Sequence, residues 1–125
     1  MAKVPIISIV DDDESVREAT KSLVRSLGFS AATFASAEDY LESECAQDTA
    51  CLITDVQMPG MNGVDLQSRL IADGYDMPII FVTAFYEQKL HDRAIEAGAL
   101  GFLRKPFDDN SLINYLHKAL SHQTL

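Results

Sequence analysis

Short apolar runs and amphipathic segments alternate along this chain. The apolar runs are almost unbroken, as in strands buried on both faces, and the segments between them repeat apolar residues at helical spacing. Gly, Asn, Asp or Pro separates most of these blocks and marks the turns. The pattern predicts strands at residues 6–10, 29–34, 51–55, 79–83 and 100–104. It predicts helices at residues 14–27, 36–44, 64–72, 87–97 and 109–120.

Strand and helix therefore alternate five times with short links. Such alternation implies parallel strands joined by right-handed crossovers, with helices on both faces of the sheet. Side-chain oxygens that can cap a helix precede three of the expected helices: Asp13 the first, Ser36 the second, and Asp108 or Asp109 the last. We expect an α/β fold with a five-stranded parallel sheet flanked by five helices.

Composition is ordinary for a globular protein, with 47% hydrophobic and 23% charged residues. The 125 residues suit one domain, which we expect to span 1–125 with a core of about 4–120. A net charge of -9 argues against direct nucleic-acid binding, which needs clustered Lys and Arg, and permits a cation partner. Cys45 and Cys51 lack the spacing of a metal or redox motif, so we expect small buried hydrophobes rather than ligands or a disulfide.

The chain carries no pattern that would direct it to a membrane. Its first residues lack the apolar run of a signal peptide, and no run approaches the ~18 apolar residues of a membrane span. These observations predict a cytoplasmic protein without membrane association.

Polar side chains stand at the carboxyl ends of four expected strands. Asp11 and Asp12 follow the first strand, Asp55 ends the third, Thr83 ends the fourth and Lys105 follows the fifth. Each has an ordinary explanation alone, since an Asp can cap a turn and a lone Lys is usually solvated. In a parallel sheet, however, all carboxyl ends lie along one edge, where ligands bind. Their convergence there favours one shared site.

The chemistry of this set suits phosphoryl transfer. Clustered carboxylates repel one another unless a cation lies among them, and an oxygen-preferring ion such as Mg²⁺ fits. With that ion, Lys105 would neutralise an incoming phosphoryl group, Thr83 would hydrogen-bond one of its oxygens, and Asp55 would be the nucleophile. Without a metal, we expect repulsion among the three like charges to raise at least one carboxylate pKa.

These residues resemble the receiver domain of bacterial two-component response regulators. The resemblance covers about residues 6–120 and rests on five motifs in order. They are Asp11-Asp12, Asp55, Met58-Pro59 with Gly63, Thr83-Ala84, and Lys105-Pro106-Phe107. The resemblance implies a doubly wound, flavodoxin-like sheet of strand order 2-1-3-4-5, and it implies that Asp55 accepts a phosphoryl group from a sensor histidine kinase.

Further roles come from the resemblance alone. Asp12, Asp55 and the main-chain carbonyl of Gln57 would bind Mg²⁺ directly, and Asp11 would act through water. Thr83 and Phe102 would form a switch pair, and the Lys105–Pro106 peptide would be cis, as X-Pro bonds can be. Phosphorylation would alter the face made by helix 87–97, strand 100–104 and helix 109–120, which often mediates dimers in the family.

The sequence looks most like the sequences of receivers that precede a helix-turn-helix output domain, and this resemblance implies transcription regulation. Gln57 and Phe85 lie two residues past Asp55 and Thr83, at positions that vary in the family, so the phosphoryl lifetime is not fixed by the match. We expect the bulky Phe85 to screen the phosphoryl group from water.

Two alternatives belong to other classes. Asp11, Asp13 and Ser15 loosely mimic the nucleophile loop of haloacid-dehalogenase-like phosphatases, in which Asp11 would be phosphorylated. A degenerate receiver kept only as a binding module would lack the acceptor, the lysine or the acidic pair, and this chain has all of them.

Overall fold

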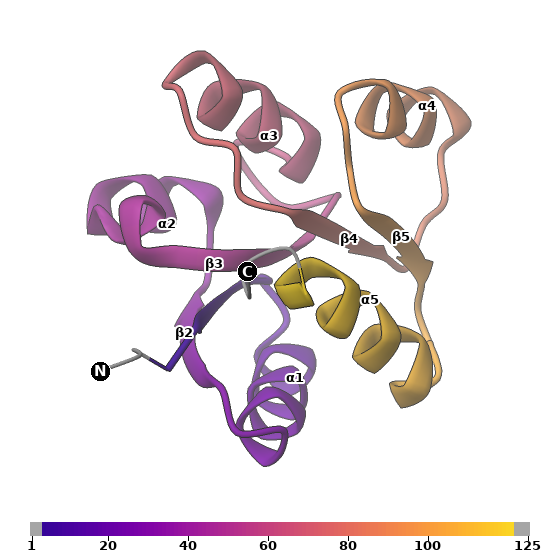
Figure 1. Ribbon diagram of the computed structural model, residues 1–125. Coiled ribbons are helices and arrows are strands. Elements are labelled where there is room, and N and C mark those ends of the chain that lie inside the picture. The colour runs from indigo at the N-terminus through magenta and orange to yellow at the C-terminus, as the bar shows by residue number, and fades with distance from the viewer. Residues whose placement is uncertain (1–3, 122–125) are drawn as a thin grey trace.

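A five-stranded parallel sheet forms the centre of the molecule (Figure 1). It is seen in a computed structural model that describes residues 4–121. The strands are β1 (Ile6–Val10), β2 (Ser30–Phe34), β3 (Thr49–Asp55), β4 (Ile79–Thr83) and β5 (Gly101–Arg104). Their order across the sheet is β2-β1-β3-β4-β5, with every neighbouring pair parallel. The doubly wound sheet and its strand order are confirmed.

Helices cover both faces of this sheet. They are α1 (Glu14–Ser26), α2 (Ala37–Ser43), α3 (Gly63–Ala72), α4 (Gln88–Glu96) and α5 (Asp109–Ser121). Figure 1 shows α1 and α5 on one face and α2, α3 and α4 on the other. The five predicted helices are all present, each within a few residues of its expected bounds.

Two apolar clusters, one on each face, hold these layers together. Side chains of successive strand residues point to opposite faces, so β3 sends Leu52 into one cluster and Cys51 and Ile53 into the other. Phe81 of β4 packs beneath α3 and α4, whereas Leu112 of α5 packs on the second cluster. Because both faces are covered, the strands need the continuous apolar runs that the sequence shows.

The first two helices start after their predicted capping residues. The Asp13 carboxylate accepts hydrogen bonds from the amides of Ser15 and Val16, and the Ser36 hydroxyl accepts one from Asp39. Both contacts satisfy amides that the first turn of a helix leaves free. The cap at Asp13 fixes where β1 gives way to α1, and so fixes the loop that carries Asp11 and Asp12.

The segment between α2 and β3 departs from the prediction. Glu44 adopts a left-handed conformation (φ 62°), which ends α2 and allows the 3₁₀ helix η1 (Cys45–Asp48). The strand then begins at Thr49, two residues earlier than the apolar run indicates. The buried Thr49 hydroxyl makes hydrogen bonds of 2.8 Å with Ser8 Oγ, the Tyr40 hydroxyl and the Cys45 carbonyl, so a polar residue is satisfied inside the core.

Other expectations can be checked directly. Cys51 is buried, Cys45 is half-buried, and neither is in a disulfide. The Lys105–Pro106 peptide is cis, as the resemblance implies. Among residues 4–121, no helix is long and apolar enough to span a membrane.

Candidate functional site

Three carboxylates meet at the carboxyl edge of the sheet. Asp11 and Asp12 follow β1, and Asp55 is the last residue of β3. Each offers an oxygen within 4.8 Å of those of the other two. The neighbouring positions of β1 and β3 in the sheet produce this convergence, which confirms the expected cluster.

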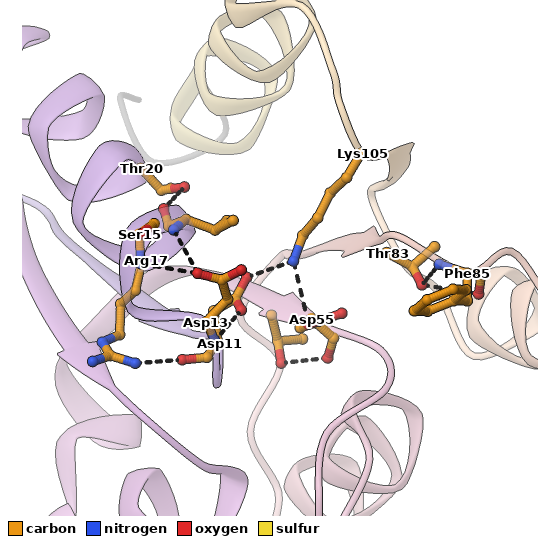
Figure 2. Close-up of polar contacts among 11 residues, drawn as sticks. Asp11, Asp13, Ser15, Arg17, Thr20, Asp55, Thr83, Phe85 and Lys105 are labelled. Carbon is orange, nitrogen blue, oxygen red and sulfur yellow. Dashed lines mark hydrogen bonds and ion pairs between the residues drawn. The ribbon is translucent and has the colours of Figure 1, made fainter.

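Lys105 joins the cluster from the end of β5. Its Nζ donates to Asp11 Oδ2 at 2.9 Å and to Asp55 Oδ2 at 3.3 Å (Figure 2). Burial of the ammonium lowers its pKa, but the hydrogen bonds and charges of Asp11 and Asp55 outweigh that effect and raise the pKa of Lys105 above its ordinary value. Lys105 is therefore a cation held between two carboxylates.

Asp55 has a strongly shifted pKa of about 6, against an ordinary value of 3.8. Burial of the carboxyl is the largest cause, Lys105 opposes it, and the charges of Asp11 and Asp12 raise the pKa further. The direction agrees with the sequence expectation, but the leading cause is burial rather than repulsion among like charges. The pattern of apolar residues could not predict burial as the main cause, because it does not show how deeply the end of a strand is buried.

Asp11 is held at all of its polar groups. Its amide donates to the Phe34 carbonyl, its carbonyl accepts from Arg17 Nη1 at 2.7 Å, and its Oδ1 accepts from the Asp13 amide. Oδ2 accepts from Lys105, and only 1% of the residue is exposed. Asp12, in contrast, is exposed and makes no hydrogen bond or ion pair with another residue of the described range 4–121. Asp11 is thus buried and fixed by its hydrogen-bond partners, whereas Asp12 is exposed and lacks such partners among the described residues.

The loop after β3 is fixed by Gly63. The Gly63 amide donates to the Val56 carbonyl at 2.8 Å, and a Cβ at this position would collide with the Asp55 carbonyl oxygen. Only glycine permits this close approach of α3 to the strand end. The Gln57 side chain donates from Nε2 to Glu87 Oε2 at 3.3 Å.

Thr83 lies at the same edge, but its hydroxyl is engaged elsewhere. Its Oγ1 donates to the Phe85 carbonyl at 3.0 Å and accepts from the Phe85 amide at 3.2 Å. Figure 2 shows this pair apart from the Lys105 bridge. The Phe85 side chain is largely exposed, at 72% for the residue. Its screening of a phosphoryl group stays a prediction.

Phe102 lies in an aromatic cluster with His91 and Tyr86. Its ring is 4.8 Å from that of His91 and 6.1 Å from that of Tyr86, and the Arg104 guanidinium lies 4.1 Å from the centre of the Tyr86 ring. The cluster joins the loop before α4, helix α4 and strand β5. Tyr86 and Arg104 were missed because their contacts join separate elements and leave no periodic signal.

Comparison with known proteins decides the family. The model of the response regulator receiver domain matches residues 7–117, nearly the whole chain. The chain belongs to the response regulator receiver domain family. The match gives no support to the phosphatase alternative. In this receiver domain Asp11, the nucleophile of that alternative, is buried with both carboxylate oxygens already engaged.

Relatives of the receiver domain are response regulators. It is 42% identical over 115 residues to the response regulator protein TmoT of Ectopseudomonas mendocina, covering 92% of this chain and 52% of TmoT. It is 36% identical over 114 residues to the transcriptional regulatory protein FixJ of Azorhizobium caulinodans, covering 91% of this chain and 54% of FixJ. The chain thus spans about half the length of the curated relatives it matches.

Solved structures agree with this assignment. The response regulator StyR superposes with a TM-score of 0.88 at 40% identity, over 96% of this chain and 61% of StyR. The structure described as FixJ-N superposes with a TM-score of 0.84 at 32% identity, over 97% of each chain. The domain is therefore a phosphorelay signalling module of the response regulator type.

Proposed function

We propose that Asp55 is the residue that accepts the phosphoryl group, in a Mg²⁺-dependent reaction with a sensor histidine kinase. The observation that carries this is the geometry of Asp55, a buried carboxylate beside Asp11 and Asp12 and bound to Lys105. We further propose that residues 1–125 form one receiver domain, with a core of about 4–120.

The donor set suits a hard divalent cation. Carboxylate oxygens are the ligands that Mg²⁺ prefers, together with water. Asp12 and the Asp55 oxygen not bound to Lys105 would hold the ion directly, with the main-chain carbonyl of Gln57, because these oxygens accept no hydrogen bond from the described residues. Asp11 would act through water, since Asp13 and Lys105 already occupy its oxygens. When bound, the ion would neutralise negative charge on the phosphoryl oxygens.

The chain's own residues prepare Asp55 for attack. With a pKa of about 6, the carboxylate is mostly ionised at neutral pH. An Asp55 oxygen would form the new bond to phosphorus while the phosphorus–nitrogen bond of the donor breaks, its electron pair returning to the imidazole nitrogen. Lys105, already on Oδ2, would supply positive charge without reorganisation. The domain would thus be a phosphoacceptor that assists its own phosphorylation and dephosphorylation, rather than an enzyme acting on a separate substrate.

Thr83 and Phe102 would carry the signal away from Asp55. The Thr83 hydroxyl would leave the Phe85 backbone to bind the phosphoryl group, and the Phe102 ring would turn inward in response. The rearranged surface would be the face of α4, β5 and α5, which would control an output domain or mediate a homodimer. Since the relatives include transcriptional regulators of about twice this length, the output would be transcription regulation in the cytoplasm.

Replacement of the acceptor tests the proposal. Asp55→Asn should abolish labelling by acetyl phosphate in Mg²⁺, because it removes the nucleophile. Asp76→Asn, at an exposed position outside the site, is the matched control and should label normally. Mass spectrometry of the labelled peptide should place the phosphoryl group on Asp55. Labelling of Asp55→Asn at the wild-type rate would sink the assignment, and a label on Asp11 would restore the phosphatase alternative.

A further inference from the structure

Arg17 contacts the loop that carries Asp11 and Asp12, and the proposed function gives this contact no role. Its Nη1 donates to the main-chain carbonyl of Asp11 at 2.7 Å, and Figure 2 shows the side chain extending from α1 to this oxygen. Helical side chains lean toward the N-terminus of their helix, which brings the guanidinium over the first turn. The contact is half-buried and shorter than any other hydrogen bond to Asp11.

This carbonyl belongs to the peptide that joins Asp11 to Asp12. A peptide unit is planar, so fixing its oxygen fixes the plane and the position of the Asp12 Cα. The Asp11 amide is bound to Phe34 on β2, which anchors the other side of the residue. Arg17 therefore controls the last backbone unit before Asp12.

Asp12 has little else to orient it. Its side chain is exposed and makes no hydrogen bond or ion pair among residues 4–121, whereas Asp11 and Asp55 are both bound to Lys105. An exposed ligand that lacks its own anchors depends on its backbone for its direction. A charged, planar donor such as Arg17 provides a firm anchor for one carbonyl.

We propose that Arg17 is a positioning residue that presents the Asp12 carboxylate to the divalent cation. It does so through the Asp11–Asp12 peptide and touches neither the ion nor the phosphoryl group. The inference rests on the proposed function, because it assumes that Asp12 is a ligand. The inference adds Arg17 to the proposed function, as a residue that lies outside the carboxylate cluster and sets the affinity of the site for the ion.

The experiment measures Mg²⁺ affinity by calorimetry in wild type, Arg17→Met, Arg17→Lys and Arg25→Met. Loss of a partner that orients a ligand weakens metal binding about tenfold or more, and we expect this for Arg17→Met. Arg17→Lys keeps a long donor and should restore most of the affinity. Arg25→Met removes the same charge from the exposed end of α1, so it should bind Mg²⁺ as wild type does.

A measurement on wild type needs no variant to fold. NMR of the arginine side chains should show restricted rotation of the Arg17 guanidinium without metal, and freely rotating Arg25. Free rotation of Arg17, unchanged affinity in Arg17→Met, or equal losses in Arg17→Met and Arg25→Met would each overturn the inference while leaving the proposed function intact. If wild type binds no Mg²⁺, both the proposed function and the inference fail.

Discussion

At the scale of single residues, burial governs Asp55 more than charge does. Its carboxyl is covered at a strand end, and Lys105 only partly offsets the loss of hydration. The result is a group that ionises near pH 6, about two units above its ordinary value. The buried Asp55 carboxylate is therefore a source of instability when no cation is bound.

This has a measurable effect on the metal-free protein. Because the folded-state pKa is raised above the unfolded value of 3.8, the folded state binds more protons than the unfolded state between about pH 4 and pH 6. The contribution of Asp55 to stability thus becomes less favourable as pH rises through this window. At pH 7, Asp55→Asn should be more stable than wild type by on the order of 1–3 kcal/mol.

Urea unfolding with a chelator, at about pH 4 and pH 7, provides the measurement. The difference between Asp55→Asn and wild type cancels the titration of carboxylates that are not coupled to Asp55, and it should grow with pH. Equal stability of the two proteins at both pH values, or a less stable variant at pH 7, would contradict a raised Asp55 pKa.

At the scale of elements, α4 is joined to α3 by polar contacts as well as by apolar packing. Ala94 is its only buried residue in the described structure, and its first turn has no side-chain cap. Gln67 of α3, which is 1% exposed, donates from Nε2 to the Ala94 carbonyl at 3.1 Å. The Gln67 Oε1 is buried without a partner among residues 4–121. On the surface, Arg93 adds a 2.8 Å ion pair with Asp65.

We predict that Gln67→Ala loosens α4 without loosening the sheet. Loss of one buried hydrogen bond is worth about 1 kcal/mol, so amide exchange in α4 should accelerate roughly five- to tenfold. Arg93→Ala removes only exposed contacts, to Asp65 and Ser68, and should accelerate exchange about twofold. Hydrogen exchange with mass spectrometry resolves the two effects. Equal acceleration in β1 and β3 would show global destabilisation instead.

The sequence predicts these elements well where turn residues interrupt the apolar runs. It predicts them poorly where they depend on contacts between residues far apart in the sequence. The strand ends at Asp11, Asp55 and Lys105 follow from apolar runs broken by Asp or Pro, and the site follows from them. The 3₁₀ helix after Glu44 could not be predicted, because a left-handed glutamate carries no local signal. The partners of Arg17 and Gln67 could not be predicted either, since their contacts depend on the packing of separate segments.

At the scale of the whole molecule, the parallel sheet joins the carboxyl edge, where Thr83 lies, to the face of α4, β5 and α5. Strand β4 ends at Thr83 at the carboxyl edge, and its Phe81 packs against Phe102 of β5 with ring centres 5.9 Å apart. A change at the edge can therefore reach the face of α4, β5 and α5 through two adjacent strands. A switch needs such an element with two arrangements.

We predict that beryllofluoride, which mimics the phosphoryl group, changes this face in the presence of Mg²⁺. Amide resonances of α4 and β5 should shift, and sedimentation should show whether the face then forms a dimer. Asp55→Asn is the control and should show neither change. Wild type with unchanged sedimentation and no amide shifts on this face would contradict the proposed transmission.

The turn from Thr83 to Phe85, whose backbone binds the Thr83 hydroxyl, affects the relative populations of the two arrangements in the proposed switch. Two hydrogen bonds to the Phe85 backbone hold the hydroxyl away from Asp55. At about 1 kcal/mol net for each, they favour the resting arrangement by roughly thirtyfold. Moving a two-state equilibrium from 1:99 to 99:1 takes about 5.5 kcal/mol, so these bonds amount to about a third of that requirement. In the proposed switch, this short turn would keep most unmodified molecules in the inactive arrangement, and phosphorylation would have to supply enough binding free energy to replace its hydrogen bonds.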